Sequence, residues 1–306
     1  MEIHNSIFQR RPYVSLFALT AALLWGWAYP LIKMGFAEFG IAADMTSSKM
    51  LFAGIRFCIS GLIILLIAGR RGVSFSVRDG KAWWFILAFS LLNTTLHYAF
   101  FYFGLSHSEG SRASIVNSLS VFLVVILACF IFKSDRMTMK KALGCIVGIG
   151  GVMVLNTGSA AGGSAQFSWE GDGMIILNAI CSAAATLMTR GLGKRVDVFV
   201  GTGYSLALGG LLLIIPGLLL GGMLPNVTLA GIAILCGLIV ISTTGFSLYN
   251  KLLSCNPVGK VAIFNSLIPV IGVLSSCACL GEPFYWKYLL SGGLAAAGIY
   301  IINSTK

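Results

Sequence analysis

About ten apolar runs, most of them close to 20 residues long, follow one another along this 306-residue chain. A helix needs a run of about that length to cross the ~30 Å hydrocarbon core of a bilayer. Only 10% of the residues are charged, against ~25% in soluble globular proteins. Inside a bilayer the backbone finds no water, so each run must satisfy its own hydrogen bonds as a helix. The sequence therefore predicts an all-α polytopic membrane protein with ten transmembrane helices.

A long internal repeat divides these helices into two sets of five. Residues 113–156 return as residues 261–303, and the Asn-Ser-Leu triplet that begins at Asn117 returns at Asn265. A repeat that fills half of the chain indicates a duplicated domain rather than a solenoid. The expected domains are a first five-helix repeat at residues 1–156, a Gly/Ser/Ala-rich linker at 157–172 and a second five-helix repeat at 173–306.

The distribution of Lys and Arg predicts the orientation of the chain. If the N-terminus lies in the cytoplasm, most of the 21 Lys and Arg residues fall in cytoplasmic segments, as the positive-inside rule requires. The net charge of +11 is thereby explained without a nucleic-acid partner. We expect a multi-pass protein of the plasma membrane with both termini in the cytoplasm.

Five is an odd number, so the second repeat must enter the membrane from the side opposite to the first. The two sets are therefore predicted to be inverted repeats, from which many secondary transporters build alternating access around a site near the midplane. This architecture favours a transporter over a channel. An enzyme is not expected, because the sequence holds no HExxH, no G-x-S-x-G and no pair of intramembrane aspartates.

Several motifs carry a resemblance to a known family. They are ALLWGWAYPLIK in the first helix, the Arg of GIRF in the second, NPVGKVAIFNSLIPVIG in the ninth and LGEPFYWKYLLSGGLAAAGIYIIN at the end. Over residues 16–303 the chain resembles the drug/metabolite transporter superfamily, specifically its bacterial EamA-type members. The resemblance implies export of small metabolites, often amino acids, without ATP.

Polar residues inside the predicted helices are the candidates for substrate binding, because such residues are rare and costly in a membrane. Asn93 and His97 share one face of the third helix. The repeat places Thr244 of the eighth helix at the corresponding depth. Asn117 and Asn265 are repeat mates. All of these could bind substrate, and each could instead form a hydrogen bond that ties helices together.

Arg56 and two aromatic residues complete the candidate site. Arg56 lies about two turns inside the second helix, where it could attract a substrate carboxylate, pair with Asp44 or Glu282, or extend outward to the membrane surface. Trp27 and Tyr204 are candidates to line the cavity. The remaining aromatic residues near helix ends, Tyr102 and Tyr249 among them, are expected at the membrane interface.

The acidic residues lie in loops or at helix ends, so no carboxylate is expected at mid-depth. This favours a uniporter, an exchanger or coupling without a buried acid, and it argues against a pump for organic cations. A carrier of phosphorylated or nucleotide-sugar metabolites is the main alternative, although it would require more cations in the cavity. A drug efflux permease is a further alternative. No cofactor or metal site is expected. The expected partners are a small-molecule substrate and the lipid bilayer. Small-residue rows in the fifth and tenth helices let helices approach closely, either between the two halves of the chain or between two copies in a homodimer.

Overall fold

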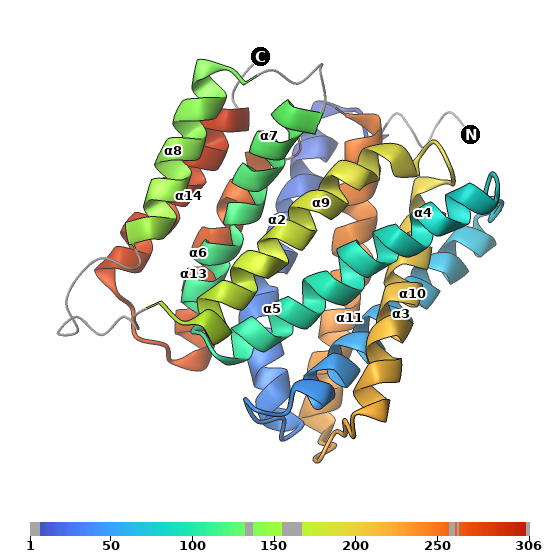
Figure 1. The fold of residues 1–306 in the computed structure, drawn as a ribbon, viewed down its shortest axis with the longest axis horizontal. Coiled ribbons are helices and arrows are strands. Elements are labelled where there is room, and N and C mark those ends of the chain that lie inside the picture. Colours follow the sequence, from blue (N-terminus) through green and yellow to red (C-terminus); the bar gives the residue numbers. More distant parts are fainter. Residues whose placement is uncertain (1–6, 132–136, 155–166, 257–260, 262, 304–306) are drawn as a thin grey trace.

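The computed structural model shows a bundle of helices, and the residues that it describes contain no strand (Figure 1). The described residues are 7–131, 137–154, 167–256, 261 and 263–303. Seven of the helices are long and apolar enough to span a membrane, and Phe264–Leu280 and Trp286–Ile302 are shorter apolar helices. With the helix at Met139–Val154, they account for the ten predicted spans. The chain is thus an all-α polytopic membrane protein.

Four of the ten spans consist of more than one α-helix or contain an irregular turn at their start. The first five spans are α2 (Arg11–Glu38), α3 (Thr46–Arg70), α4–η1–α5 (Gly80–Ser90, Leu91–Leu96, His97–Ser106), α6–α7 (Gly110–Asn117, Leu119–Ile131) and α8 (Met139–Val154). The second five are η3–α9 (Trp169–Gly173, Met174–Leu192), α10 (Val198–Leu219), α11 (Leu229–Cys255), η4–α13 (Ile263–Ser266, Leu267–Leu280) and α14 (Trp286–Asn303). Residues 155–166 of the predicted linker lie outside the described residues, and the domain boundaries remain predictions.

Side-chain caps fix where several spans begin. The carboxylate of Asp79 accepts a hydrogen bond from the backbone N–H of Ala82 at the start of α4, and Asp197 does the same at α10. Thr228 caps α11 through the N–H of Gly231. These caps satisfy backbone donors that a helix start leaves without a partner, so the polar loop residues determine the lengths of the apolar helices.

The helices of the two halves pack against each other in a symmetric pattern. α2 packs against α11 and α13 of the second half, and its counterpart α9 packs against α5 and α7 of the first half. The second and seventh spans, α3 and α10, pack against each other, as do the fifth and tenth, α8 and α14. α2 begins at the same end of the bundle at which α9 ends, so the two helices run in opposite directions through it (Figure 1). Each contact therefore has a counterpart related by a pseudo-two-fold axis, as expected for inverted repeats.

Glycines allow the closest of these contacts. A Cβ atom on Gly144 of α8 would lie 2.7 Å from the carbonyl oxygen of Gly298 in α14, so the small-residue row of the fifth span packs the two halves of one chain together. Gly293, which begins the small-residue row of the tenth span, has no atom within 4 Å of a built Cβ. The homodimer remains a prediction.

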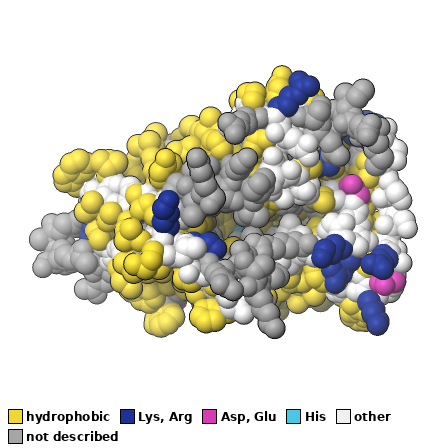
Figure 2. Space-filling view, turned by 90° about the horizontal axis from the view of Figure 1, so that it is seen from above, with side chains coloured by type: hydrophobic (Ala, Val, Ile, Leu, Met, Phe, Trp, Pro, Cys, Tyr) yellow, Lys and Arg dark blue, Asp and Glu magenta, His cyan; other side chains and the backbone are white. Residues whose placement is uncertain are grey.

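Both ends of the described chain lie at the same end of the bundle, as an even number of spans requires (Figure 1). This end is called the termini end, and the opposite one the distal end. Figure 2 looks onto the termini end and shows more Lys and Arg than Asp and Glu side chains on it. The cytoplasmic location of the termini end remains a prediction.

Candidate functional site

The fourth and ninth spans are interrupted at corresponding positions. α6 ends at Asn117, and α7 begins at Leu119. In the second half a 3₁₀ turn ends at Ser266, and α13 begins at Leu267. Discontinuous helices of this kind surround the binding sites of many transporters. The repeat mates Asn117 and Asn265 sit at these interruptions.

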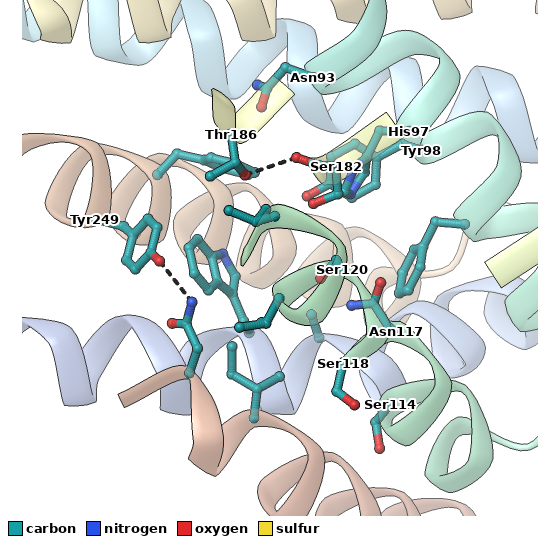
Figure 3. A pocket seen from close by; sticks show the side chains of 18 of the residues that line it. Asn93, His97, Tyr98, Ser114, Asn117, Ser118, Ser120, Ser182, Thr186 and Tyr249 are labelled. Atoms are coloured by element: carbon teal, nitrogen blue, oxygen red, sulfur yellow. Dashed lines mark hydrogen bonds between the residues drawn. The ribbon is translucent and has the colours of Figure 1, made fainter. Parts of the chain in front are cut away.

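A cavity of about 210 Å³ lies between the two halves at the interruptions. Five of the eight predicted site residues line it: Arg56, Asn93, His97, Asn117 and Asn265. In Figure 3, Asn93, Ser182 and Thr186 lie along one side of the pocket, and Asn117 and Ser120 lie along the other. Its aromatic lining includes Trp25, Tyr29, Tyr98, Phe101, Phe246 and Tyr249.

Asn117 connects three spans through its amide group. Its Nδ2 donates to the hydroxyl of Tyr29 at 2.9 Å, and its Oδ1 accepts from Nδ2 of Asn178 at 2.6 Å. Tyr29 belongs to the first half, and Asn178 belongs to the second. Asn117 therefore joins the halves and lines the cavity at the same time, and its contact with substrate remains a prediction.

Asn265 is held in a similar way by a tyrosine. Its Nδ2 donates to the hydroxyl of Tyr249 at 2.7 Å (dashed in Figure 3). The ring of Tyr249 also packs edge-on against Trp25, with 4.9 Å between the ring centroids. The indole N–H of Trp25 is buried and has no hydrogen-bond partner among the described residues. The prediction that Tyr249 belongs to an interfacial belt is wrong, because its ring and hydroxyl are used inside the bundle.

The third span has a π-helical segment, η1, where it meets the cavity. Such segments frequently occur at functional sites because they displace side chains from the regular helical pattern. Asn93 lies in η1 and donates from Nδ2 to the Ser205 hydroxyl at 3.0 Å. His97 follows directly, and its buried Nδ1 has no partner among the described residues. His97 thus offers a ring nitrogen that a bound molecule can reach with one hydrogen bond.

Among the described residues, Arg56 is the one arginine that lines the cavity. It is 2% exposed. Nε donates to Ser242 Oγ at 2.7 Å and to the carbonyl of Leu238 at 3.2 Å, and Nη1 donates to the hydroxyl of Tyr102 at 2.8 Å. The ion pairs among the described residues do not include Arg56, so the suggested pairing with Asp44 or Glu282 is wrong. Tyr102 is 1% exposed, which also contradicts its predicted place at the interface.

The other three predicted residues lie away from the cavity lining. Trp27 is 45% exposed on the outside of α2. Tyr204 packs against Trp83 with 5.2 Å between the ring centroids. Thr244 is half-buried on α11. None of the three is among the described residues that line the cavity, and their role in substrate binding remains a prediction.

Tyr29, Asn178, Ser182 and Thr186 contribute to the site or its support, yet the sequence did not single them out. The sequence does contain a signal for Asn178, because an Asn within an apolar run is costly unless it has a hydrogen-bond partner. The internal repeat gives no support for it, because no Asn stands at the corresponding position of the first repeat. No group of three His, Cys, Asp or Glu residues that could hold a metal occurs in the described part of the chain.

Comparison with known proteins gives a consistent family match. The model of the EamA-like transporter family matches the chain twice, at residues 13–157 and 169–304. A Bacillus subtilis protein named "Uncharacterized transporter YvbV" is 28% identical over 290 residues, which covers 92% of this chain and 88% of that protein. Salmonella typhimurium has a "Probable amino-acid metabolite efflux pump" that is 24% identical and covers 93% of this chain and 92% of its own length.

A solved crystal structure has the same fold. It superposes with a TM-score of 0.70 at 18% sequence identity and covers 95% of this chain and 96% of the other. At this identity the similarity concerns the fold alone.

Proposed function

The chain belongs to the EamA-like transporter family, and from this premise we propose that it exports amino acids or related small metabolites by alternating access to the cavity between its two repeats. As a member of this family it is a transporter rather than an enzyme, and it contacts both the lipid bilayer and a small-molecule substrate. The substrate class, the direction and the mechanism are the proposal.

The observation that carries the proposal is the buried guanidinium of Arg56 beside the cavity. A buried charge is costly unless an opposite charge or a full set of hydrogen bonds compensates it. The three partners of Arg56 are neutral, and Nη2 has no hydrogen-bond partner among the described residues. A substrate carboxylate would supply the missing charge and could accept two N–H bonds from the planar guanidinium.

The rest of the lining suits a small zwitterion. The amide oxygens of Asn93 and Asn265 can accept hydrogen bonds from the ammonium group of such a substrate. The aromatic faces of Trp25 and Tyr98 also attract an ammonium group. The volume of about 210 Å³ is below the ~300–1,000 Å³ typical of pockets for drug-sized ligands. These features favour a single amino acid over a bulky drug.

The main alternatives fit less well. A phosphorylated or nucleotide-sugar substrate would require several Lys or Arg residues in the cavity, and Arg56 is the only one among the described residues that line it. A cationic drug would require a carboxylate, and the described lining contains none. The names of the Salmonella and Escherichia coli relatives, both "Probable amino-acid metabolite efflux pump", also favour amino acids.

We place the protein in the plasma membrane with the termini end in the cytoplasm. The Lys and Arg residues of the termini end support this orientation. The described part of the cavity contains no acidic group, which favours a uniporter, an exchanger or coupling without a buried acid.

Efflux from proteoliposomes tests the substrate class. Vesicles that hold the purified protein and a radiolabelled neutral amino acid are expected to release it with saturable kinetics, whereas protein-free vesicles release it slowly. A matched vesicle set holds the corresponding amine, which lacks the carboxylate, and is expected to show little release. Saturable release of an organic cation, with no release of any amino acid, would overturn the proposal.

Substitutions in the third span test whether its polar residues contact substrate. Asn93→Ala and His97→Ala are each expected to lower the efflux rate at subsaturating substrate by about 5- to 20-fold, which corresponds to a lost hydrogen bond of about 1–2 kcal/mol. Expression and melting temperature should change little, because a hydrogen bond between membrane helices contributes only about 0.6 kcal/mol on average.

Thr20→Ala is the matched control for these variants. The Thr20 hydroxyl bonds to the carbonyl of Leu16 in its own helix at an exposed position, so efflux should stay at the wild-type rate. Normal efflux in both Asn93→Ala and His97→Ala would remove the third span from the binding site.

A further inference from the structure

Ion pairs join the two repeats at the distal end of the bundle. The pairs among the described residues are Lys33–Glu282, His107–Glu170 and Arg112–Asp172. In each pair the cation comes from the first five spans and the carboxylate from the second five, with Glu170 and Asp172 in η3 at the start of the sixth span. The paired residues lie at or near the distal ends of the spans (Figure 1). The distal end is therefore held closed by charged contacts between the two halves.

The contact between Arg112 and Asp172 is the most buried of these pairs. Nε and Nη2 of Arg112 each donate to one carboxylate oxygen of Asp172 at 2.7 Å. The two side chains are both 3% exposed. A bidentate pair in this setting is strong and directional, and removal of one partner would leave a buried charge.

Glu282 holds the N-terminus of α6 from the other half of the chain. Its carboxylate accepts from the N–H groups of Gly110 and Ser111 at 2.7 and 3.0 Å, and from the Ser111 hydroxyl at 2.7 Å. Burial alone would raise the pKa of Glu282, but these hydrogen bonds and the charge of Lys33 together hold the pKa below its ordinary value. Glu282 thus remains a negatively charged carboxylate that caps α6. Its charge also interacts favourably with the positive N-terminal end of the α6 dipole.

Glycines on both sides of this contact allow Glu282 to reach α6. Gly281 ends α13 in the left-handed conformation, with φ of 63°, which glycine adopts without steric cost. The turn directs the next residue towards α6. A Cβ atom on Gly110 would lie 3.2 Å from the Cβ of Ser276 on α13, so the two halves approach closely here. Glu109 adds a further contact by accepting a hydrogen bond from Tyr288 of α14.

The cavity extends away from this closed end. Its lining reaches Thr189 and Leu253, which lie within one turn of the last residues of α9 and α11 at the termini end. Towards the distal end the lining stops at Ile32 and Ser114, and the polar contacts lie beyond them. The cavity therefore approaches one face of the membrane and is separated from the other by the network.

We infer that the contacts Arg112–Asp172, Lys33–Glu282, Glu282–α6 and Glu109–Tyr288 form the outer gate of the transporter, and that the structure is its inward-facing state. The inference rests on the proposed function. For substrate to leave at the distal end, the two repeats must separate there, and these contacts must break because each of them joins the repeats. The gate residues bind no substrate; they set the fraction of molecules in which the cavity opens outward.

Cys277 is a native reporter for the opening of this gate. Its sulfur lies 3.5 Å from the Ser111 hydroxyl, within the network. In a Cys279→Ser background it is the single cysteine after residue 255, so its labelling can be read from one segment by mass spectrometry. A membrane-impermeant maleimide is added from the distal side of proteoliposomes that hold the full-length protein. We expect Arg112→Gln/Asp172→Asn to raise the labelling rate of Cys277 by about tenfold or more, since weakening the gate populates the open state.

The pair His107–Glu170 at the same end supplies the matched control. The side chain of Glu170 is 69% exposed, that of His107 is 19% exposed, and the two lie 3.8 Å apart. Because solvent screens the Glu170 carboxylate and such pairs contribute little, His107→Gln/Glu170→Gln should leave the labelling rate within about twofold of the parent. If the Arg112 variant does not fold, Tyr288→Phe removes one gate contact while the buried Arg112–Asp172 pair stays intact, and it should raise labelling by a smaller factor.

The outcomes separate this inference from the proposed function. Unchanged Cys277 labelling in a folded gate variant whose amino-acid efflux is intact would overturn the gate and leave the function standing. Faster labelling in a protein that exports no amino acid would retain the gate and reject the substrate. An equal rise in the His107/Glu170 control would show that any charge removed at this end loosens the bundle, and would also overturn the gate.

Discussion

Replacing Arg56 with Gln is expected to reduce amino-acid efflux at subsaturating substrate by about 100-fold. A charge-assisted bond from a buried guanidinium to a carboxylate contributes roughly 3 kcal/mol, and each 1.4 kcal/mol corresponds to a factor of ten. Arg56 already has Ser242 and Tyr102 to hold it in place, so the guanidinium is oriented before substrate arrives. The measurement is the efflux of one labelled amino acid from proteoliposomes at concentrations well below saturation.

The amine that lacks the carboxylate distinguishes a binding role of Arg56 from a structural one. If Arg56 holds the carboxylate, Arg56→Gln should reduce the preference for the acid over the amine. If Arg56 only supports the fold, both fluxes should fall together with the melting temperature, and the prediction fails. Ser242→Ala removes one neutral partner of Arg56 and keeps the charge, so its efflux should fall by less than about tenfold.

The sequence was sufficient to predict the spans and their symmetry. A bilayer leaves the backbone no other solution than helices, and the duplicated Asn-Ser-Leu segments with an odd number of spans per repeat imply inversion. The helix ends observed at Asp79, Asp197 and Thr228 agree with the positions of polar loop residues between the apolar runs. These features depend on the local composition of each segment, which can be determined from the sequence alone.

The partners of individual side chains could not be predicted in the same way. Arg56 bonds to residues 46 and 186 positions away along the chain, and which partner it meets depends on the rotation of α11 and α5 about their axes. Trp27 and Tyr204 are aromatic residues within spans, which made them candidates for the cavity lining. They lie outside the lining because of how α2 and α10 are rotated about their axes. The helix interruption at Asn265 has a local cause, because Pro269 has no N–H to donate to the Asn265 carbonyl four residues earlier. No proline lies within four residues after Asn117, so the sequence holds no such signal for the interruption there.

The contact between α3 and α10 leads to the second large effect, on folding rather than on transport. A Cβ atom on Gly61 would lie 2.6 Å from the carbonyl of Gly203 and 2.8 Å from Cα of Ala207. Both are backbone atoms of α10, so the clash is relieved only if one helix moves. Gly61→Ala should therefore destabilise the protein by about 1–3 kcal/mol, although alanine is the better helix former, and Gly61→Leu should leave little folded protein.

Gly237 of α11 provides the control for this prediction, because a Cβ built there meets no atom within 4 Å. Gly237→Ala should raise stability by up to about 1 kcal/mol, the difference in helix propensity between the two residues. The same substitution is thus expected to change the melting temperature in opposite directions at the two sites. Thermal unfolding of the detergent-solubilised variants measures this, and an increase at Gly61 would show that α3 and α10 do not approach as closely as the backbone distances require. Since these two helices are symmetry mates that face each other across the halves, their separation would disrupt both the fold and the relative placement of the repeats on which the cavity depends.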